Sequence, residues 1–372
     1  MLSGSPSRQA DTSGACRAKD CAFVHGSRAY PFNKSISFGS KRQTLVKRRK
    51  KKTSNGFLIV AFIFILMVII LASYIYISEN PAVIDAIPNT PDSQPVGAVT
   101  IPADPPATVT SPNDTVKLAA LNLQIFGTSK ADKPEVMEVL SKTIRNFDIV
   151  AVQEIRDASQ TALPALRNSV NDIAGPKYDF VVSDRLGRTT SKEQYAYFFN
   201  TQTMQQIGDP YTYPDPNDLF QREPYVAEFK AMNGNFDFVL ITTHTDPDTA
   251  TQEINDLPTV VENAKGRYQG EGDFIILGDL NADCDYFNEN SQSPLRRSDY
   301  LWVINNSIDT TTKASACTYD RIILTSQAKD DFTGNSGVFR FDNVYNLTYD
   351  MTISVSDHYP VYARFWNNRD TD

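Results

Sequence analysis

A run of 21 residues without a charged side chain, from Phe57 to Ile77, most constrains how this chain can fold. At about 1.5 Å per residue, a helix of this length spans roughly 30 Å, the thickness of the hydrocarbon core of a bilayer. The run is longer than the apolar region of a usual signal peptide, and a poor cleavage site follows it. The sequence therefore predicts an uncleaved transmembrane anchor over residues 53–78, with a cleaved signal peptide as the alternative.

Charged residues flank this run asymmetrically. Eight Lys or Arg side chains lie between Lys41 and Lys52, whereas none follows the run until Lys117. This bias predicts a single-pass protein with its N-terminus in the cytoplasm and the rest of the chain on the far side of the membrane. Residues 1–52 have a net charge of +11 and the remainder −19. We interpret residues 1–52 as a mostly disordered basic tail that can contact anionic lipid, while the acidic remainder argues against non-specific coating of DNA.

Composition divides the chain beyond the anchor into two segments. Residues 79–114 contain eight prolines, which favours an extended, semi-rigid stalk rather than a helix or a packed sheet. Residues 115–372 are enough for one large domain. The far side of the membrane also allows disulfides, so we expect Cys16 and Cys21 to stay reduced and Cys284 to pair with Cys317.

Strand-like segments dominate residues 115–372. Helical spacing of apolar residues occurs over 133–146, with Pro134 near the start, and over 249–265, where Pro258 is expected to kink or split the helix. Strands outnumber helices and often follow one another, which favours an α+β fold with sheet packed on sheet and helices outside. The strand-like segments are 117–126, 147–154, 178–183, 195–199, 225–231, 236–244, 273–281, 319–324 and 360–366.

Polar side chains recur at the ends of these apolar segments. His244 and His358 each lie next to an acid at the end or the start of a segment. Asp279 and Asn281 are two residues apart, so both side chains point to one face of a strand. Any one of these residues alone fits a solvated strand end, but their joint occurrence favours one polar site at the edge of a two-sheet core. The pattern also includes Asn122, Glu154, Arg156, Tyr319, Asp320 and Arg321.

These residue types suit metal-assisted attack on phosphorus. Carboxylate and amide oxygens are ligands for Mg²⁺, Mn²⁺ or Ca²⁺, and Cys and His are too few for a closed zinc site. Hydrolysis of a phosphodiester requires neutralised phosphate oxygens, a deprotonated water and a protonated leaving oxygen. Two histidines paired with carboxylates, together with a hard metal ion, supply these requirements. We expect Asp283 and Asp285, which follow the same strand, to be solvated loop acids.

The chain from about Lys117 to Phe365 resembles deoxyribonuclease I, within the endonuclease/exonuclease/phosphatase superfamily. Glu154 and the motifs "GDLN" and "SDH" are shared across the superfamily, whereas "QEIRD", "REP" and the cysteine pair around "YDRI" point to the deoxyribonuclease I branch. The resemblance implies a four-layer sandwich of two central sheets flanked by helices. The matching stretches are "LAALNLQIFG", "FDIVAVQEIRD", "YDFVVSDRLGRTTSKEQYAYFF", "QREPYVAEF", "VLITTHTDP", "ILGDLNADC", "CTYDRII" and "ISVSDHYPV".

The resemblance implies an endonuclease that cleaves DNA and leaves 5′-phosphate and 3′-hydroxyl ends. Combined with the predicted anchor, which is not part of the usual plan of this family, it predicts a membrane-tethered enzyme that acts outside the cytoplasm. Catalysis would depend on Mg²⁺, or Mn²⁺ in its place, and Ca²⁺ would assist; Asp309 and Thr311 could serve a structural Ca²⁺, although Lys313 places a cation there. The compartment would be a periplasm, a cell surface or an organelle lumen, and no obligate protein partner is expected. The alternatives are a sphingomyelinase-like phospholipid phosphodiesterase of the same fold and a catalytically silent binding module.

The resemblance also assigns roles to residues. His244, supported by Glu193, would act as general acid, and His358, oriented by Asp320, as general base, although the two roles could be exchanged. Glu154 would hold one metal ion. The remaining residues would frame the metal and phosphate (Asp279, Asn122, Asn281 and Asp357) or contact the substrate (Arg156, Arg222 and Tyr319).

Overall fold

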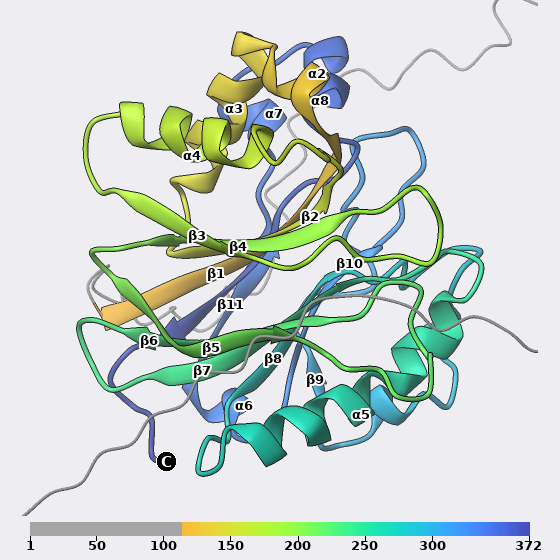
Figure 1. Cartoon of the computed structure of the whole chain (residues 1–372). Helices are drawn as coiled ribbons and strands as arrows, with labels where there is room; N and C mark the ends of the chain where they lie inside the picture. The colour runs from red at the N-terminus through yellow and green to blue at the C-terminus, as the bar shows by residue number, and fades with distance from the viewer. Residues whose placement is uncertain (1–113) are drawn as a thin grey trace, which may run out of the picture. The chain divides into compact units, whose positions relative to one another are not determined.

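The computed structural model describes residues 114–372, which form two packed six-stranded sheets with helices on their outer faces (Figure 1). The predicted tail, anchor and stalk therefore lie outside the described residues. Within residues 114–372, no helix is both long and apolar enough to cross a membrane.

The first sheet has the strand order β11-β12-β1-β2-β4-β3, and the second has the order β5-β6-β7-β8-β10-β9. The strands of the first sheet are β1 (Thr115–Phe126), β2 (Ile149–Ile155), β3 (Tyr178–Val182), β4 (Gln194–Asn200), β11 (Phe332–Val338) and β12 (Val361–Trp366). Those of the second sheet are β5 (Met204–Thr212), β6 (Tyr225–Ala231), β7 (Asp237–His244), β8 (Phe274–Asp279), β9 (Leu301–Trp302) and β10 (Asp320–Leu324). The helices are α2 (Thr128–Ala131), α3 (Pro134–Ile144), α4 (Ala162–Asp172), α5 (Ala250–Arg267), the 3₁₀ helix η3 (Pro294–Arg296), α6 (Ala328–Asp331), α7 (Phe341–Val344) and α8 (Tyr349–Val355).

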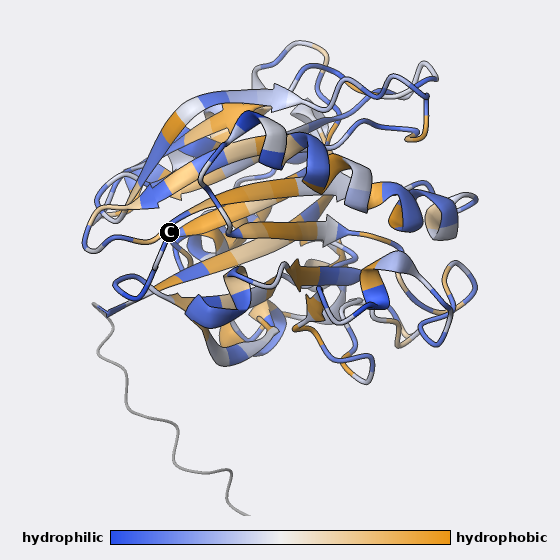
Figure 2. Cartoon of the chain, turned by 90° about the horizontal axis from the view of Figure 1, so that it is seen from below, coloured by the Kyte–Doolittle hydropathy of each residue, from blue (hydrophilic) through white to orange (hydrophobic). Residues whose placement is uncertain are grey.

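Apolar residues separate the layers of this sandwich. Along β1, Leu118 and Ala120 face the second sheet, whereas Ala119 and Leu121 face the helices α3, α4, α7 and α8, as the period of two requires. Helix α5 covers the outer face of the second sheet in the same way (Figure 1). Figure 2 shows the hydrophobic residues concentrated in the strands and the hydrophilic residues in the loops. This arrangement confirms the predicted α+β class with sheet packed on sheet.

Each sheet has one parallel strand pair at its centre, β1 with β2 and β7 with β8. Parallel neighbours end at the same edge of a sheet, so the polar residues that close these four strands gather at one edge of the sandwich. The fold thereby places the candidate site where the two sheets meet.

Several features of the fold differ from the sequence-based expectation, among them helix α5 and the edge strands β5, β9 and β11. Helix α5 runs unbroken through Pro258, so the expected split is wrong: Leu257 and Val261 on its inner face are fully buried, and this packing outweighs the lost backbone hydrogen bond. Strands β5 and β11 were not predicted. Each contains Gly and lies at the edge of its sheet, so most of its residues are partly buried or exposed; Met204 of β5 is the buried exception.

Gly278→Ala tests the backbone that carries Asp279. Gly278 has a φ of +148°, and an added Cβ would lie 2.1 Å from the carbonyl oxygen of Thr243 in the neighbouring strand β7. Since this overlap forces β7 and β8 apart, we expect the free energy of unfolding to fall by at least about 2 kcal/mol in chemical denaturation. Gly266→Ala in α5, where an added Cβ meets nothing within 4 Å, is the control and should stabilise by about 0.5–1 kcal/mol. Equal stabilities for the two variants would contradict this account.

Candidate active site

His244, the last residue of β7, is held by a buried carboxylate. Its Nδ1 lies 2.9 Å from Oε1 of Glu193, which directly precedes β4 and is fully buried. Although burial opposes both charges, the pair stabilises them: the pKa of His244 is raised by Glu193 and Asp279, and the pKa of Glu193 is lowered by His244 and Arg222. The two opposite charges thus stabilise each other despite their burial.

His358, which precedes β12, has the same arrangement with a different carboxylate. Its Nδ1 lies 2.8 Å from Oδ2 of Asp320, the first residue of β10. Burial lowers the pKa of His358, but the charges of Asp320 and Asp279 outweigh this effect and raise it to about 10. In both pairs the carboxylate binds Nδ1, so Nε2 is the nitrogen left to meet a substrate.

Asp279 lies between the two histidines. Its Oδ2 is 3.5 Å from Nε2 of His244 and 3.5 Å from Nε2 of His358. The strand register explains this convergence, because Asp279 of β8 pairs with His244 of β7 on one side and with Asp320 of β10 on the other. Burial favours the neutral acid, but the two histidines and a hydrogen bond from Asn122 hold the pKa of Asp279 below its usual value.

The first sheet contributes Asn122 and Glu154 through irregular backbone. The pairing of β1 with β2 shifts register beyond Asn122, and Glu154 has a φ of +60°, in the left-handed region. The Asn122 Nδ2 group donates to Asp279 Oδ2 at 3.0 Å and to Glu154 Oε1 at 3.1 Å. The backbone N–H of Ile125 donates to the other Glu154 oxygen at 2.9 Å. The strained turn thus aims Glu154 at the second sheet.

The three residues predicted to contact substrate all lie beside these groups. Arg156 is partly exposed and forms an ion pair of 3.1 Å with Glu154. Arg222 is nearly buried and donates from Nε to the carbonyl oxygen of His244 at 3.0 Å, while its terminal Nη2 has no hydrogen-bond partner within residues 114–372. The ring of Tyr319 is 6.2 Å from the ring of His358. Arg222 therefore supports the His244–Glu193 pair and does not pair with its neighbour Glu223.

Asn281 and Asp357 lie at the rim of the same site. Asn281 donates from Nδ2 to the carbonyl oxygen of Thr245 at 3.0 Å and from its backbone to Asp279 Oδ1 at 3.1 Å. Asp357 Oδ2 pairs with Lys313 at 2.7 Å, while its buried Oδ1 has no hydrogen-bond partner in the described domain. Lys313 thus neutralises Asp357, and Asp309 accepts hydrogen bonds from Thr311.

The donor set at this site suits a hard divalent cation. Glu154 from the first sheet and Asp279 from the second present carboxylates, and the Asn122 amide donates a hydrogen bond to each of them. One oxygen of Asp279, one oxygen of Asp320 and one ring nitrogen of His358 also lie within 4.8 Å of one another. Oxygen donors of this kind are those that Mg²⁺, Mn²⁺ and Ca²⁺ prefer. Asp357 Oδ1, which lies 3.7 Å from His358 Nε2 and accepts no hydrogen bond from a described residue, adds one more oxygen, so the residues fit such an ion.

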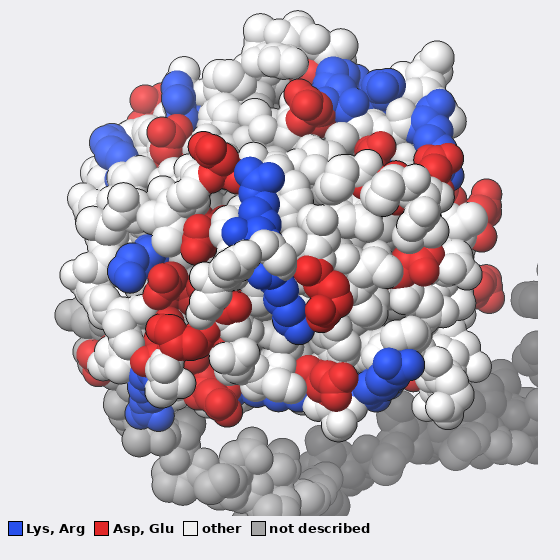
Figure 3. All heavy atoms as spheres, turned by 60° about the horizontal axis from the view of Figure 1, so that its bottom comes forward, with Lys and Arg blue, Asp and Glu red and all other residues white. Residues whose placement is uncertain are grey.

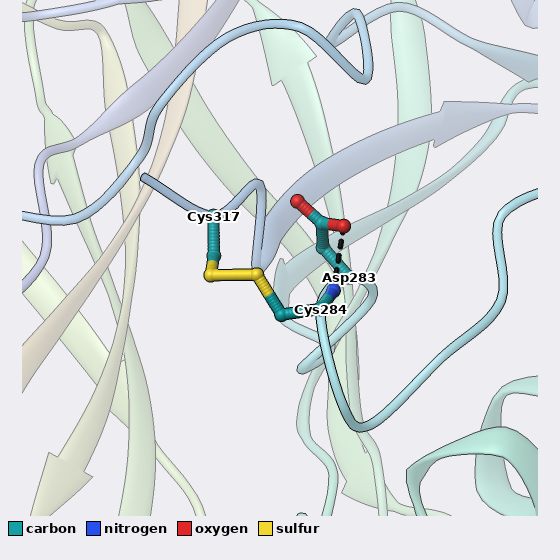
Figure 4. Close-up of side chains that lie close together, drawn as sticks. All are labelled: Asp283, Cys284 and Cys317. Carbon is teal, nitrogen blue, oxygen red and sulfur yellow. Dashed lines mark hydrogen bonds between the residues drawn. A yellow bond between two sulfur atoms is a disulfide. The ribbon is translucent and has the colours of Figure 1, made fainter. Parts of the chain in front are cut away.

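The predicted disulfide between Cys284 and Cys317 is present (Figure 4). Asp283 accepts hydrogen bonds from the backbone N–H of Cys284 and of Thr318, each at 2.6 Å. The expectation that Asp283 is only a solvated loop acid is therefore wrong, because its carboxylate binds the backbone beside each of the two cysteines. The bridge joins the loop after Asp279 to the segment that leads into Asp320.

Sequence reasoning missed two polar residues that orient the histidines. The Tyr195 hydroxyl accepts the backbone N–H of His244 at 3.1 Å, and Ser356 Oγ accepts that of His358 at 3.0 Å while donating to the carbonyl oxygen of Asn122 at 2.6 Å. Their positions could have indicated this role, because each is two residues from a predicted site residue: Tyr195 follows Glu193 and Ser356 precedes His358.

Comparisons with known proteins show which family this chain resembles. A sequence profile described as the Endonuclease/Exonuclease/phosphatase family matches residues 119–358. Deoxyribonuclease gamma of Homo sapiens is 36% identical over 267 residues, which cover 68% of this chain and 87% of that protein. Deoxyribonuclease-1 of Bos taurus is 33% identical over 257 residues, covering 66% and 90%. A solved structure of an endonuclease/exonuclease/phosphatase family protein from Bacteroides thetaiotaomicron matches with a TM-score of 0.47 and 15% identity, covering 67% and 97%.

The Asp320→Asn variant tests whether the charge of Asp320 raises the pKa of His358. In metal-free protein, an NMR titration should show the wild-type His358 ring losing its proton near pH 10, and at clearly lower pH in the variant, because the strongest raising charge is gone. The stability that depends on the imidazolium is complete below the unfolded pKa of about 6.5 and is lost as pH rises through about 10. The variant should lack this part of the pH dependence of unfolding. Identical titration curves would contradict the assigned pairing.

Proposed function

This chain belongs to the endonuclease/exonuclease/phosphatase family and is a hydrolytic nuclease or phosphodiesterase, and we propose that its substrate is DNA. In this proposal it is a divalent-metal-dependent endonuclease that leaves 5′-phosphate and 3′-hydroxyl ends. The observation that carries the proposal is the convergence of His244 and His358 on one oxygen of Asp279, each through Nε2 and each with its Nδ1 bound by a buried carboxylate. The names of the relatives, both deoxyribonucleases, favour DNA as the substrate class.

The two histidines supply the proton transfers of phosphodiester hydrolysis. In the proposed reaction, water attacks phosphorus, His358 Nε2 takes a proton from that water, and the bond between phosphorus and O3′ breaks. His244, whose protonated form Glu193 favours, donates its Nε2 proton to the leaving O3′. Asp320 and Glu193 fix the ring orientation and stabilise each imidazolium. Because the two sites have equivalent geometry, the exchanged assignment uses the same atoms.

Glu154 and Asp279 would hold the metal ion, with Asn122 keeping their carboxylates together and Asn281 fixing the loop after Asp279. The family depends on a divalent metal ion. When bound, the ion supplies positive charge that neutralises the phosphate oxygens and offsets the carboxylates that raise the pKa of His358. This chain's own residues must place the phosphodiester between the two Nε2 atoms.

Three cationic side chains form ion pairs with acidic residues of this site. Arg156 is partly exposed and pairs with Glu154, and Lys313 pairs with Asp357. Arg222 Nη2 has no hydrogen-bond partner among the described residues. We propose that these groups bind the phosphates that flank the scissile bond, and that Tyr319 packs beside the sugar of the same strand. The membrane tether and the extracytoplasmic location stay proposals from the uncharged run and the preceding basic cluster.

The His244→Ala and His358→Ala variants test the proposed roles directly. Each should lower the rate of supercoiled-plasmid nicking by roughly 10²–10⁴-fold or more, because each removes one proton transfer. Far-UV circular dichroism should be unchanged. His25→Ala is the matched control, since it is the same substitution outside the described domain, and it should nick at the wild-type rate. Wild-type rates for both active-site variants would show that the site is elsewhere.

A substrate and metal comparison tests the proposed chemistry. The full-length protein should nick plasmid with Mg²⁺ or Mn²⁺, lose this activity in excess EDTA and recover it when Mg²⁺ is restored. The products should be ligatable ends with a 5′-phosphate and a 3′-hydroxyl. Sphingomyelin vesicles, tested in the same buffers, should not be hydrolysed. Turnover of sphingomyelin without nicking of DNA would replace the proposed function with the phospholipid alternative.

A further inference from the structure

A second group of carboxylates lies at the opposite end of β8 from Asp279. Asp273 directly precedes β8, and Asp370 and Asp372 follow β12; one carboxylate oxygen of each lies within 4.8 Å of the other two. Since a strand rises about 3.3 Å per residue, this group is about 20 Å from Asp279 and separate from the active site. Nothing in the proposed nuclease chemistry uses it.

Asp273 is the unusual member of this group. Its side chain is fully buried, and neither carboxylate oxygen accepts a hydrogen bond or forms an ion pair with any described residue. A buried carboxylate without donors is costly, and such groups in proteins are normally paired or bound to a metal ion. Burial, together with the negative charges of Asp331 and Glu271, raises the pKa of Asp273 to about 9.

Acidic residues surround the buried Asp273, and a hollow lies beside two of them. Asp370 and Asp372 line a hollow of about 290 Å³, and no Lys or Arg is among its lining residues. The backbone fixes the acids, because Asp370 accepts the N–H of Asp237 and of Asp372, each at 3.1 Å, and Glu271 accepts the N–H of Asp273 at 2.6 Å. Acidic side chains also gather on the face of the domain seen in Figure 3. The remaining lining residues are Glu228, Asp237, Tyr268, Gln269, Gly270 and Glu271.

We propose that Asp273, Asp370 and Asp372 bind one Ca²⁺ ion, which fixes the segment after β12 to the start of β8. All three ligands are carboxylates, and no nitrogen or sulfur donor belongs to the group, which favours a hard cation. Ca²⁺ accepts six to eight oxygens in variable geometry, so three carboxylates on separate strands and water can complete its shell. Mg²⁺ requires a stricter octahedron and is less suited to such a site. This inference is independent of the proposed nuclease activity.

Bound Ca²⁺ would stabilise the folded chain by mass action. It would give the oxygens of Asp273 the partner that the protein does not provide, and it would offset the repulsion among the neighbouring acids. The site would join residues nearly one hundred positions apart in the chain, roughly the separation of Asp273 and Asp370. Loss of the ion should therefore loosen the segment after β12 first.

Equilibrium dialysis of the full-length protein against Ca²⁺, with thermal unfolding of the same samples, tests this site. Asp273→Asn should bind one Ca²⁺ fewer per chain than wild type. Wild type should gain about 5 °C in Tm when Ca²⁺ is raised to a hundredfold excess over its Kd, and the variant should lack the part of this gain that the site supplies. Asp330→Asn is the matched control, because Asp330 is an exposed acid next in sequence to Asp331, whose charge acts on Asp273, and it should bind Ca²⁺ like wild type.

Folding of the variants does not decide the outcome. Without Ca²⁺, Asp273→Asn should be at least as stable as wild type, because it removes an unpartnered buried acid. Asp370→Asn, at the partly exposed side of the group, provides a second variant and should also bind one Ca²⁺ fewer. If both variants bind as many Ca²⁺ ions as wild type and show the same rise in Tm, the group binds no ion and the proposal is wrong.

Discussion

One carboxylate oxygen, Asp279 Oδ2, organises the site on which the proposed chemistry depends. It faces Nε2 of both histidines at 3.5 Å and accepts a hydrogen bond from Asn122 of the opposite sheet. A buried charge is tolerated only where such partners are fixed in place. The register of β7, β8 and β10 fixes two of them, and the irregular end of β1 fixes the third. The apolar core between the sheets holds these strand ends at the distance that the contacts require.

Each remaining part of the site supports this centre from a different direction. Glu193 and Asp320 bind Nδ1 of each histidine and fix the orientation of its ring, while Arg222 forms an ion pair with Glu193. The disulfide, capped by Asp283, joins the loop that leaves Asp279 to the segment that enters Asp320. Both sheets therefore contribute to each proton-transfer pair: His244 and Asp320 lie on strands of the second sheet, whereas Glu193 and His358 lie just before strands of the first. The first sheet also supplies Glu154 and Asn122 for the metal and phosphate.

The sequence was sufficient to predict what depends on local pattern. Period-two alternation identified the central strands, and the polar residues that close them identified His244, Asp279 and His358. Edge strand β5 and the unbroken helix α5 could not be predicted, because tertiary packing rather than propensity decides them. The hydrogen bond from Thr318 to Asp283 and the one from His244 to Tyr195 join residues far apart in the sequence, so residue spacing could not predict them. The burial of Asp273 beside residues far along the chain is of the same kind.

The central claim is that His244 and His358 act in one transition state on either side of one phosphodiester. A double-mutant cycle on the rate of plasmid nicking, with His244→Ala, His358→Ala and the double variant, measures this coupling most directly. If the two residues are acid and base of the same step, the double variant should be about as slow as the slower single variant. If the two losses instead multiply, the histidines act independently and the account of a single shared site is wrong.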